Sequence, residues 1–209
     1  MLDYICNSLN HRMAQTWKDE DISLDSIKDE TIAVIGYGIQ GDAQSNNMKD
    51  SGLSVVIGLK DGGSSWQKAK DDGHEVLSVA DACKKADIIH ILIPDMIQAK
   101  VYKEEIAPNL SEGNALSFSH AAAIYWKWID APDNVDVIMV APKGPGSKVR
   151  ETYLENFGTP SIVAVEQDKT GKAWDRTLGI GKAIGSAKAG LIKTSFKEEV
   201  ETDWFGEQA

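Results

Sequence analysis

Three acidic residues in the last part of the sequence have the spacing that one face of a helix requires. Glu199, Asp203 and Glu207 follow one another at intervals of four within a segment of helical pattern, so a helix would carry them in one column. Like charges at this spacing repel each other by roughly a few tenths of a kcal/mol per pair. A divalent cation would remove that repulsion, and oxygen ligands of this kind suit Mg²⁺. The spacing indicates a magnesium site, although on spacing alone a solvated acidic face is the simpler interpretation.

A glycine-rich turn with the pattern G-x-G-x-x-G lies near the start of the patterned region. Gly36, Gly38 and Gly41 follow a predicted strand and open a predicted helix, which is the setting of a dinucleotide-binding turn. Gly36 would permit the tight turn, Gly38 the approach of a pyrophosphate, and Gly41 the close packing of helix on strand. The helix N-terminus would offer free N–H groups to the phosphates. The pattern predicts nucleotide binding, with a glycine turn that holds no ligand as the alternative.

The loop after the second predicted strand should meet the ribose of the adenosine. Asp61 lies 20 residues after Gly41, about where a carboxylate accepts a hydrogen bond from the ribose 2′-hydroxyl. Lys60, Ser64 and Ser65 could instead hold a 2′-phosphate. Because a carboxylate repels a phosphate, Asp61 favours tolerance of NADH. A solvated turn residue is the alternative for Asp61.

The elements that would position these residues begin at Thr31. Short β-branched runs predict strands at residues 31–35, 54–59, 88–93, 115–118, 136–140, 161–165 and 191–194. The stretches between them predict helices at residues 40–50, 66–72, 79–86, 97–107, 147–157 and 171–184. The strands are nearly continuous apolar runs, which indicates a sheet covered on both faces. We therefore predict an α/β fold of the Rossmann-like, doubly wound kind over residues 28–194, with a mostly parallel sheet and residues 1–27 as an extension and lead-in.

Composition excludes several classes of partner. The chain has 209 residues and a net charge of −10, which argues against nucleic acid. Its apolar runs are shorter than the ~18 residues that a membrane span needs, and the first residues show no signal peptide. Cys6 and Cys83 form no metal or disulfide motif, which fits a cytoplasmic protein. Cys83 is expected to pack in the core, and His74 and His90 belong to no motif and are expected to be structural.

Five longer motifs resemble the ketol-acid reductoisomerase family. They are GYGIQG at 36–41, IPDMIQ at 93–98, SFSHAAA at 117–123, DVIMVAPKGPG at 136–146 and FKEEVETDWFGEQA at 196–209. The resemblance covers about residues 17–209 and implies a nucleotide-binding Rossmann domain followed by a helical knotted domain, of which residues 195–209 are the start. It also implies an Mg²⁺-dependent alkyl migration in a 2-acetohydroxy acid, followed by NAD(P)H reduction to a 2,3-dihydroxy acid, in branched-chain amino-acid biosynthesis.

The resemblance also implies roles for single residues. Asp203 and Glu207 resemble ligands of two Mg²⁺ ions, and Glu199 resembles the acidic residue that hydrogen-bonds bound water. His120 and Lys143 resemble catalytic residues beside the metal. The cofactor contacts that we expect from these motifs and from the ribose loop are Tyr37, Gly38, Ile39, Gln40, Lys60, Asp61, Gly63, Ser65, Asp95, Met96, Ile97, Gln98 and Gly146.

The chain departs from the family pattern at some positions. Lys60 and Gly63 stand where Arg and Ser are common, which weakens 2′-phosphate binding and leaves the choice between NADH and NADPH open. Ala121–Ala123 stands where many members have a Gly-Phe-Asn run. The sequence ends inside the acidic helix, so we expect an incomplete chain with little turnover alone and a homo-oligomer for the complete protein. A hydroxy-acid dehydrogenase without an isomerase step and a non-catalytic nucleotide-binding module remain as alternatives.

Overall fold

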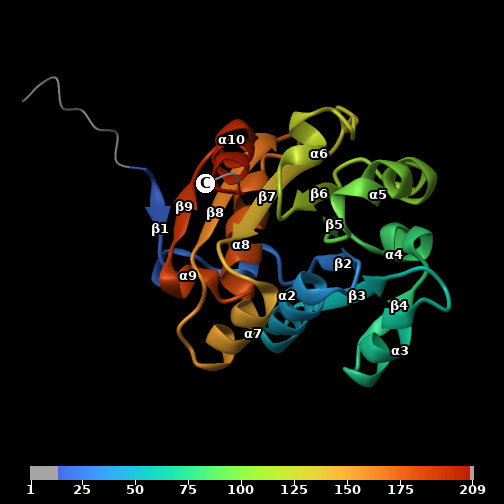
Figure 1. Ribbon diagram of the computed structural model, residues 1–209, viewed down its shortest axis with the longest axis horizontal. Coiled ribbons are helices and arrows are strands. Elements are labelled where there is room, and N and C mark those ends of the chain that lie inside the picture. The colour runs from blue at the N-terminus through green and yellow to red at the C-terminus, as the bar shows by residue number, and fades with distance from the viewer. Residues whose placement is uncertain (1–13, 208–209) are drawn as a thin grey trace, which may run out of the picture.

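The computed structural model describes residues 14–207, with side chains for residues 14–203, and is built around one sheet (Figure 1). Among these residues the sheet has nine strands in the order β1-β9-β8-β7-β6-β5-β2-β3-β4. The strands are β1 Thr16–Trp17, β2 Thr31–Ile35, β3 Ser54–Gly58, β4 Glu75–Leu77, β5 Ile88–Ile91, β6 Ala115–Phe118, β7 Asp136–Pro142, β8 Ser161–Gln167 and β9 Leu191–Lys193.

Most strand pairs are parallel, as the apolar runs predicted. The β7–β8 and β1–β9 pairs are antiparallel, and the other six pairs are parallel. The predicted α/β fold with a mostly parallel sheet is therefore confirmed, and each predicted strand lies within two residues of the observed one at either end. β1 and β4 were not predicted, because neither Thr16–Trp17 nor Glu75–Leu77 contains an apolar, β-branched run. β1 places two residues of the expected lead-in at the edge of the sheet.

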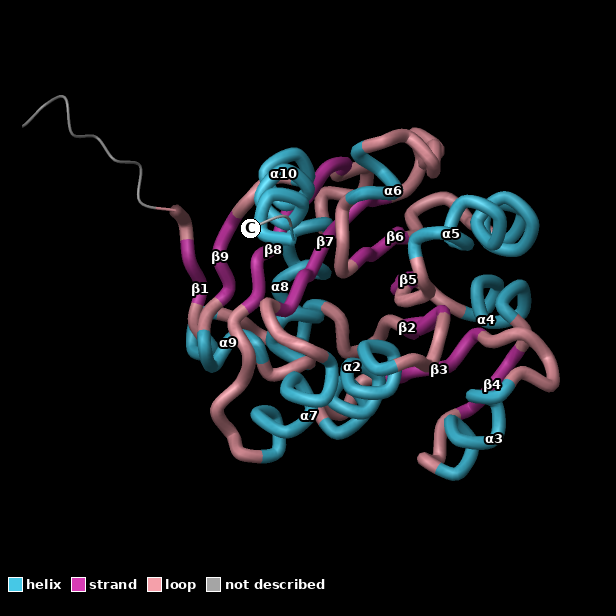
Figure 2. The backbone as a smooth tube through the Cα atoms, in the orientation of Figure 1, coloured by secondary structure: helices cyan, strands magenta, loops and turns pink. Residues whose placement is uncertain are grey.

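Helices connect the strands and lie on both faces of the sheet (Figure 2). They are α2 Ile39–Asp50, α3 Ser64–Asp71, α4 Val79–Lys85, α5 Asp95–Val101, α6 Ala122–Tyr125, α7 Gly146–Leu154, α8 Ala173–Ala183, α9 Ser186–Ala189 and α10 Phe196–Glu207. Short 3₁₀ turns occur at Asp19–Asp21, Leu24–Ser26 and Ala107–Asn109, and a π turn spans Tyr102–Ile106. α6 and α9, each of four residues, were not predicted.

Two helix ends were predicted wrongly. The helix expected at 147–157 ends at Leu154. The expected helix at 97–107 was to end at Pro108, but the helical run continues from α5 through the π turn into the 3₁₀ turn that contains Pro108. A proline is tolerated there because the first residues of a helical turn have no intrahelical use for their N–H groups.

Alternate residues of the central strands enter two separate cores. On β2, Ile32 and Val34 pack with α2, α3 and α8, whereas Ala33 and Ile35 face the core that includes residues of α4, α6 and α10. Both faces are covered, which explains why the strand has no alternation of polar and apolar residues. The buried Cys83, on α4, belongs to the second of these cores, as expected, while Cys6 lies outside the described residues. Within the described part of the chain, no helix is long and apolar enough to cross a membrane.

The sheet has its topological switch point between β2 and β5. From β2 the chain continues through β3 and β4 toward one edge, and from β5 through β6 and β7 toward the other. At such a point, the connections after the carboxyl ends of the strands diverge and leave a crevice in which open α/β folds bind ligands. The glycine turn follows β2, residues 92–98 follow β5, and His120 follows β6, so this crevice is where the predicted site residues should meet.

Candidate active site

The glycine turn has the backbone geometry that its pattern predicts. Gly36 has φ +103°, a conformation that side chains rarely adopt. A Cβ at Gly41 would lie 2.3 Å from the carbonyl oxygen of Gly36, whereas a Cβ at Gly38 would meet nothing within 4 Å. α2 begins at Ile39, directly after Gly38, and the first N–H groups of a helix have no intrahelical acceptors. The turn thus leaves open space beside hydrogen-bond donors and the positive end of a helix dipole.

Tyr37, Ile39 and Gly146 border a cavity of about 470 Å³ beside this turn. The Tyr37 side chain is directed inward, with its hydroxyl donating to Asp72 Oδ2 at 2.7 Å and accepting from Asn46 Nδ2 at 3.0 Å. Gly146 opens α7, and a Cβ there would lie 2.3 Å from the carbonyl oxygen of Ile39. Because Gly146 has no side chain, α7 can approach the start of α2 closely. Ile39 and Gly146, two expected cofactor contacts that are 107 positions apart, therefore line the same cavity.

The predicted ribose loop lies between β3 and α3. Lys60 lines a separate cavity of about 400 Å³, whose wall also carries Ile97 and the charged side chains of Lys100, Glu104 and Glu105. Asp61 is exposed, and Gly63 and Ser65 stand at the start of α3. This part of the crevice therefore presents charges of both signs. It is not a uniformly basic pocket of the kind that strongly selects a phosphate.

Residues 95–98 form the first turn of α5, where the chain leaves β5. Met96 is 95% exposed, whereas Gln98 is 4% exposed. The Gln98 amide donates to Ile93 O at 3.0 Å and to Asp95 Oδ1 at 2.8 Å, but its Oε1 has no hydrogen-bond partner within residues 14–203. Gln98 also lines a cavity of about 190 Å³, together with Gln40, Ser119 and His120 among others. Because a buried acceptor without a partner is costly, this oxygen would favour a ligand that donates an N–H group.

The orientation of α10 is determined by its first two turns. Ser195 and Glu198 cap the helix reciprocally: the Glu198 N–H donates to Ser195 Oγ, and the Ser195 N–H donates to the Glu198 carboxylate, each at 3.2 Å. Phe196 and Val200 are buried in the core, and α10 packs on α6 and β8. This packing directs Glu199, which is 1% exposed, toward the loop after β6. Glu207 lies on α10, but its side chain is outside the described part.

Charged groups from three segments meet around Glu199. The His120 Nδ1 lies 3.1 Å from the Glu199 carboxylate, and the Ala121 N–H donates to the same carboxylate at 3.0 Å. Lys143 Nζ lies 3.5 Å from both the Glu199 and the Asp203 carboxylates. The expected column is therefore observed for its first two members, Glu199 and Asp203, and it faces His120 and Lys143. The His120, Glu199 and Asp203 ligand atoms lie within 4.8 Å of one another.

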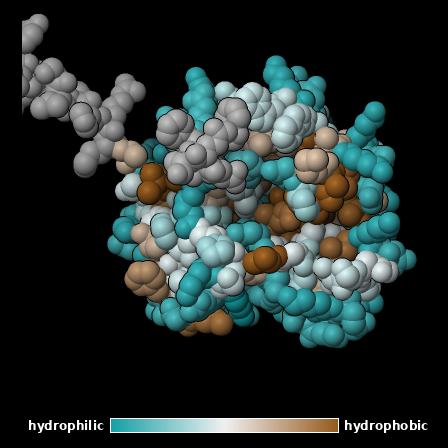
Figure 3. Space-filling view, in the orientation of Figure 1, coloured by the Kyte–Doolittle hydropathy of each residue, from teal (hydrophilic) through white to brown (hydrophobic). Residues whose placement is uncertain are grey.

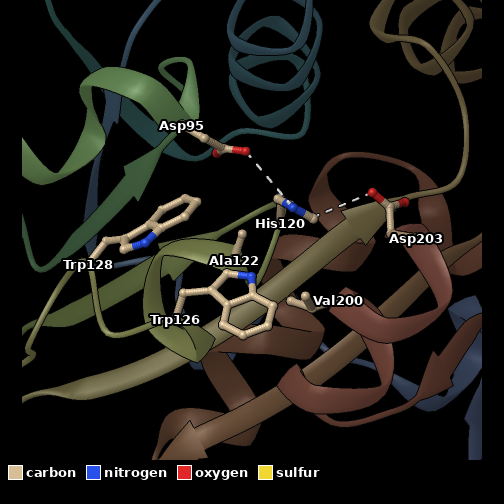
Figure 4. Close-up of a pocket in the computed structure, with 7 residues that line it drawn as sticks. All are labelled: Asp95, His120, Ala122, Trp126, Trp128, Val200 and Asp203. Carbon is tan, nitrogen blue, oxygen red and sulfur yellow. Dashed lines mark ion pairs between the residues drawn. The ribbon is translucent and has the colours of Figure 1, made fainter. Parts of the chain in front are cut away.

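The second imidazole nitrogen of His120 faces the crevice. His120 Nε2 lies 3.9 Å from Asp95 Oδ2, and Asp203 lies 3.8 Å from Nδ1 on the other side of the ring (Figure 4). The His120 side chain is 32% exposed and the Asp203 side chain 39% exposed, so both reach solvent in the crevice. A ligand that enters between α5 and α10 would contact His120 directly.

The cluster favours charged forms of both His120 and Glu199. Burial alone would raise the pKa of Glu199, but the hydrogen bonds from His120 and from the Ala121 N–H outweigh burial and hold that pKa below its usual range. The hydrogen bond to Glu199 raises the pKa of His120, whereas burial lowers it. The negative charges of Asp95 and Asp203 raise it further, so that the pKa lies above its usual value. Both shifts favour an imidazolium–carboxylate pair between His120 and Glu199.

This pair predicts a measurable pH dependence of the chain without divalent cations. The pKa of His120, followed by NMR of the imidazole Hε1, should lie above 6.5 and should fall in Glu199→Gln. Because the pKa of His120 is higher in the folded than in the unfolded chain, its pairing with Glu199 stabilises the fold fully below about pH 6.5. This stabilisation is lost as the pH rises through the folded-state pKa of His120. A His120 pKa that is unchanged by Glu199→Gln would contradict the assignment.

Two tryptophans that the sequence analysis did not single out border the same crevice. Trp126 and Trp128, each 50% exposed, line a cavity of about 560 Å³ together with Asp95, His120 and Asp203. Hydrophobic side chains also reach the surface beside α5, around the hollow of this face (Figure 3). Two tryptophans separated by a single residue, in a segment without strand or helix periodicity, are the sequence signal that could have drawn attention to this wall.

Comparison with known proteins agrees with this arrangement. Residues 26–190 match the family model described as acetohydroxy acid isomeroreductase, NADPH-binding domain. Relatives named ketol-acid reductoisomerase (NADP(+)) are 85% identical in Nitrosopumilus maritimus and 81% identical in Cenarchaeum symbiosum, in each case over 94% of this chain and 59% of the relative.

A solved structure is also similar. It is titled as an NADH-preferring ketol-acid reductoisomerase from an uncultured archean, and it superposes with a TM-score of 0.90 at 49% identity over 93% of this chain and 60% of the other. This chain thus spans about three fifths of the length of the proteins it matches. The family match, the identity and the shared fold together show that the chain belongs to the acetohydroxy acid isomeroreductase family.

Proposed function

We propose that this chain is the nucleotide-binding portion of a ketol-acid reductoisomerase. The substrate would be a 2-acetohydroxy acid, 2-acetolactate or 2-aceto-2-hydroxybutyrate, and the pathway the biosynthesis of valine, isoleucine and leucine. The observation that carries the proposal is the cluster of His120, Lys143, Glu199 and Asp203 beside the glycine turn. Because the chain spans 59% of its relatives, we propose that turnover needs the remaining length and that the chain alone has little or no activity.

A nicotinamide cofactor fits the crevice. The open space above Gly38 and the start of α2 suit a pyrophosphate. Gln98 Oε1, which has no partner among the side chains and backbone that the structure describes, lies in the cavity that His120 also lines and suits the carboxamide N–H of a nicotinamide. We propose that the cofactor crosses the switch point from the Lys60 cavity to the His120 cavity, and that the thirteen expected contact residues surround it.

We propose that the site accepts both NADH and NADPH. The relatives are named for NADP(+), whereas the similar solved structure is titled NADH-preferring. Lys60 offers one positive charge to a 2′-phosphate, but Glu104 and Glu105 line the same cavity and Asp61 lies next to Lys60. These carboxylates would offset the attraction of Lys60 for the phosphate.

The acidic face of α10 fits magnesium. Asp203 is half-exposed and directs its carboxylate into the crevice, which suits a hard cation that keeps several waters. Glu199 is buried and already accepts hydrogen bonds from His120 and the Ala121 N–H, so it suits the orientation of a bound water better than direct ligation. We propose Asp203 and Glu207 as ligands of two Mg²⁺ ions, which when bound would polarise the ketone and hydroxyl oxygens of the substrate.

The protein's own groups have complementary tasks in this proposal. Glu199 holds a proton on His120 Nδ1, which leaves Nε2 facing the crevice, where it can give or take a proton at a substrate oxygen. Lys143 places a positive charge 3.5 Å from the Asp203 carboxylate, where it can stabilise negative charge on the reacting oxygens. Trp126 and Trp128 provide an apolar wall on one side of the site.

The remaining expectations belong to the complete protein. We propose that residues 28–194 form its nucleotide-binding domain and that residues 195–209 begin a helical domain. We also propose that the complete protein is a homo-oligomer in the cytoplasm. We propose that it has no nucleic-acid partner, and the net charge of −10 supports this last point.

The test uses a polypeptide in which this chain is continued by the remaining sequence of the Nitrosopumilus maritimus relative. With 2-acetolactate and NADPH, we expect turnover that EDTA abolishes and added Mg²⁺ restores. Asp203→Asn should lower kcat at least about 100-fold. Glu201→Gln, which removes an exposed carboxylate of the same helix, should leave kcat within about twofold of the parent.

The same assay separates the alternatives. A hydroxy-acid dehydrogenase without an isomerase step would reduce its ketone in EDTA and would tolerate Asp203→Asn. A nucleotide-binding module would bind cofactor without any turnover. Either outcome would overturn the proposed function.

A further inference from the structure

A series of hydrogen-bonded polar side chains leads from the centre of the sheet to the cavity that Gln98 and His120 line. His90, on β5, is 0% exposed, and its Nε2 lies 2.9 Å from Gln44 Oε1 while its Nδ1 lies 2.8 Å from Ser117 Oγ. Gln44, on α2, is also 0% exposed. Three polar side chains, from two strands and a helix, are thus joined inside the core.

The contacts of the Gln44 amide favour one direction for these hydrogen bonds. The Gln44 amide donates both of its hydrogens, to Gln40 Oε1 at 3.0 Å and to Ser119 Oγ at 3.1 Å. Its Oε1 must therefore accept, so His90 carries its proton on Nε2 and accepts at Nδ1 from the Ser117 hydroxyl. Burial lowers the pKa of His90 to about 4, which agrees with a neutral ring.

Gln40 and Ser119 lie at the end of this hydrogen-bonded series that is farthest from His90, and both line the cavity of Gln98 and His120. Gln40 Nε2 also donates to Gly144 O at 3.1 Å, and Ser119 Oγ donates to Val140 O at 2.9 Å. With Gln44 in this orientation, the Gln40 and Ser119 side chains are each held by two hydrogen bonds, one to Gln44 and one to a backbone carbonyl. If Gln44 turned over, its oxygen would face Gln40 Oε1 and the oxygen of a serine whose hydrogen is already donated, so the turned amide would lose two bonds.

We propose that His90 is a positioning residue for the nicotinamide end of the site: through Gln44 it holds Gln40 and Ser119 in place at the wall of the cavity. This inference rests on the proposed function, because it assumes that the nicotinamide occupies this cavity. It changes the expectation that His90 is only structural. His90 touches no ligand, and its effect passes entirely through Gln44.

A second buried histidine provides a matched control. His74 Nε2 lies 3.1 Å from Asn46 Oδ1, so it also holds an amide of α2. The Asn46 amide, however, donates to the Tyr37 hydroxyl and to Asp42 rather than toward the Gln98 cavity. Loss of His74 should therefore disturb α2 without a selective effect on the nicotinamide.

The experiment compares NADH with ADP-ribose, which lacks the nicotinamide, by calorimetric titration of the 209-residue chain. His90→Leu should raise the Kd for NADH about tenfold, the equivalent of one lost hydrogen bond, and leave the Kd for ADP-ribose within about twofold. His90→Gln, which can still donate to Gln44, should recover most of the NADH affinity. His74→Leu should change both Kd values by the same factor.

Gln44→Leu provides a second route if His90→Leu does not fold, because it breaks the same link at Gln44 and leaves His90 in place. It should show the same selective loss of NADH affinity. Equal effects on both ligands, or no rescue by His90→Gln, would leave the proposed function standing and overturn the positioning role. Absence of binding of either ligand to the parent chain would overturn both.

Discussion

Replacement of Gly38 by alanine is expected to abolish most of the nucleotide affinity and to leave the fold intact. Gly38 has φ −82°, a conformation open to alanine, and a Cβ there would meet nothing within 4 Å. The added methyl group would occupy the space through which the pyrophosphate reaches the N–H groups of α2. The loss of two charge-assisted hydrogen bonds between the pyrophosphate and these N–H groups would raise the Kd for the nucleotide roughly 100-fold.

Calorimetric titration with NADH and a thermal melt of the same sample measure the two parts of this prediction. Gly41→Ala is the contrasting variant, because its Cβ would lie 2.3 Å from the Gly36 carbonyl oxygen; it should lower the melting temperature itself. If Gly38→Ala bound NADH as the parent does, the phosphates would have to lie elsewhere.

The second large effect is expected from Arg176 on α8, which is buried beside the amino ends of β2, β6 and β7. Its guanidinium donates to Asp136 at 2.8 Å, to Gly113 O at 2.9 Å, and to the Glu30 carboxylate through two nitrogens. Asp136 is 0% exposed. Burial alone would raise the pKa of Asp136, but hydrogen bonds from Thr170 and its neighbours outweigh burial and hold that pKa below its usual range. The carboxylate therefore remains charged.

Arg176→Leu should lower the free energy of unfolding by about 3–5 kcal/mol, because it leaves Asp136 charged, buried and without its partner. Urea titration followed by circular dichroism measures this change. Arg176→Leu combined with Asp136→Leu should recover much of the loss, since the unpaired charge is then gone. Lys85→Gln, which breaks the exposed pair with Glu75, should have no measurable effect. A small effect of Arg176→Leu alone would contradict the role assigned to the buried pair.

The parts of the fold that the sequence predicted are those determined by neighbouring residues. The apolar run Thr31–Ile35 and the glycines after it indicate a strand, a turn and a helix start from neighbouring residues. The column of Glu199 and Asp203 was likewise predictable, because helical spacing places both on one face. β1 was not, because its two residues form a strand only by pairing with β9, more than 170 positions away.

The contacts between distant segments required the structure. His120 and Glu199 are 79 positions apart, and spacing contains no sign that the carboxylate would be buried against the imidazole. The three alanines after His120, for which the sequence offered no explanation, are buried against the core that also contains Phe196 and Val200. Their small side chains let α10 approach closely enough for Glu199 to accept the Ala121 N–H. His90 looked structural because its partner Gln44 is not a neighbour in sequence.

The central claim is that the glycine turn and the acidic face of α10 serve one reaction site. A crystal structure of the chain bound to NADPH tests it most directly, because it locates both ends of the cofactor at once. We predict the pyrophosphate over Gly38 and the nicotinamide ring in the cavity beside Gln98 and His120, facing Asp203. A nicotinamide that points away from His120, or a nucleotide bound elsewhere on the sheet, would contradict the account.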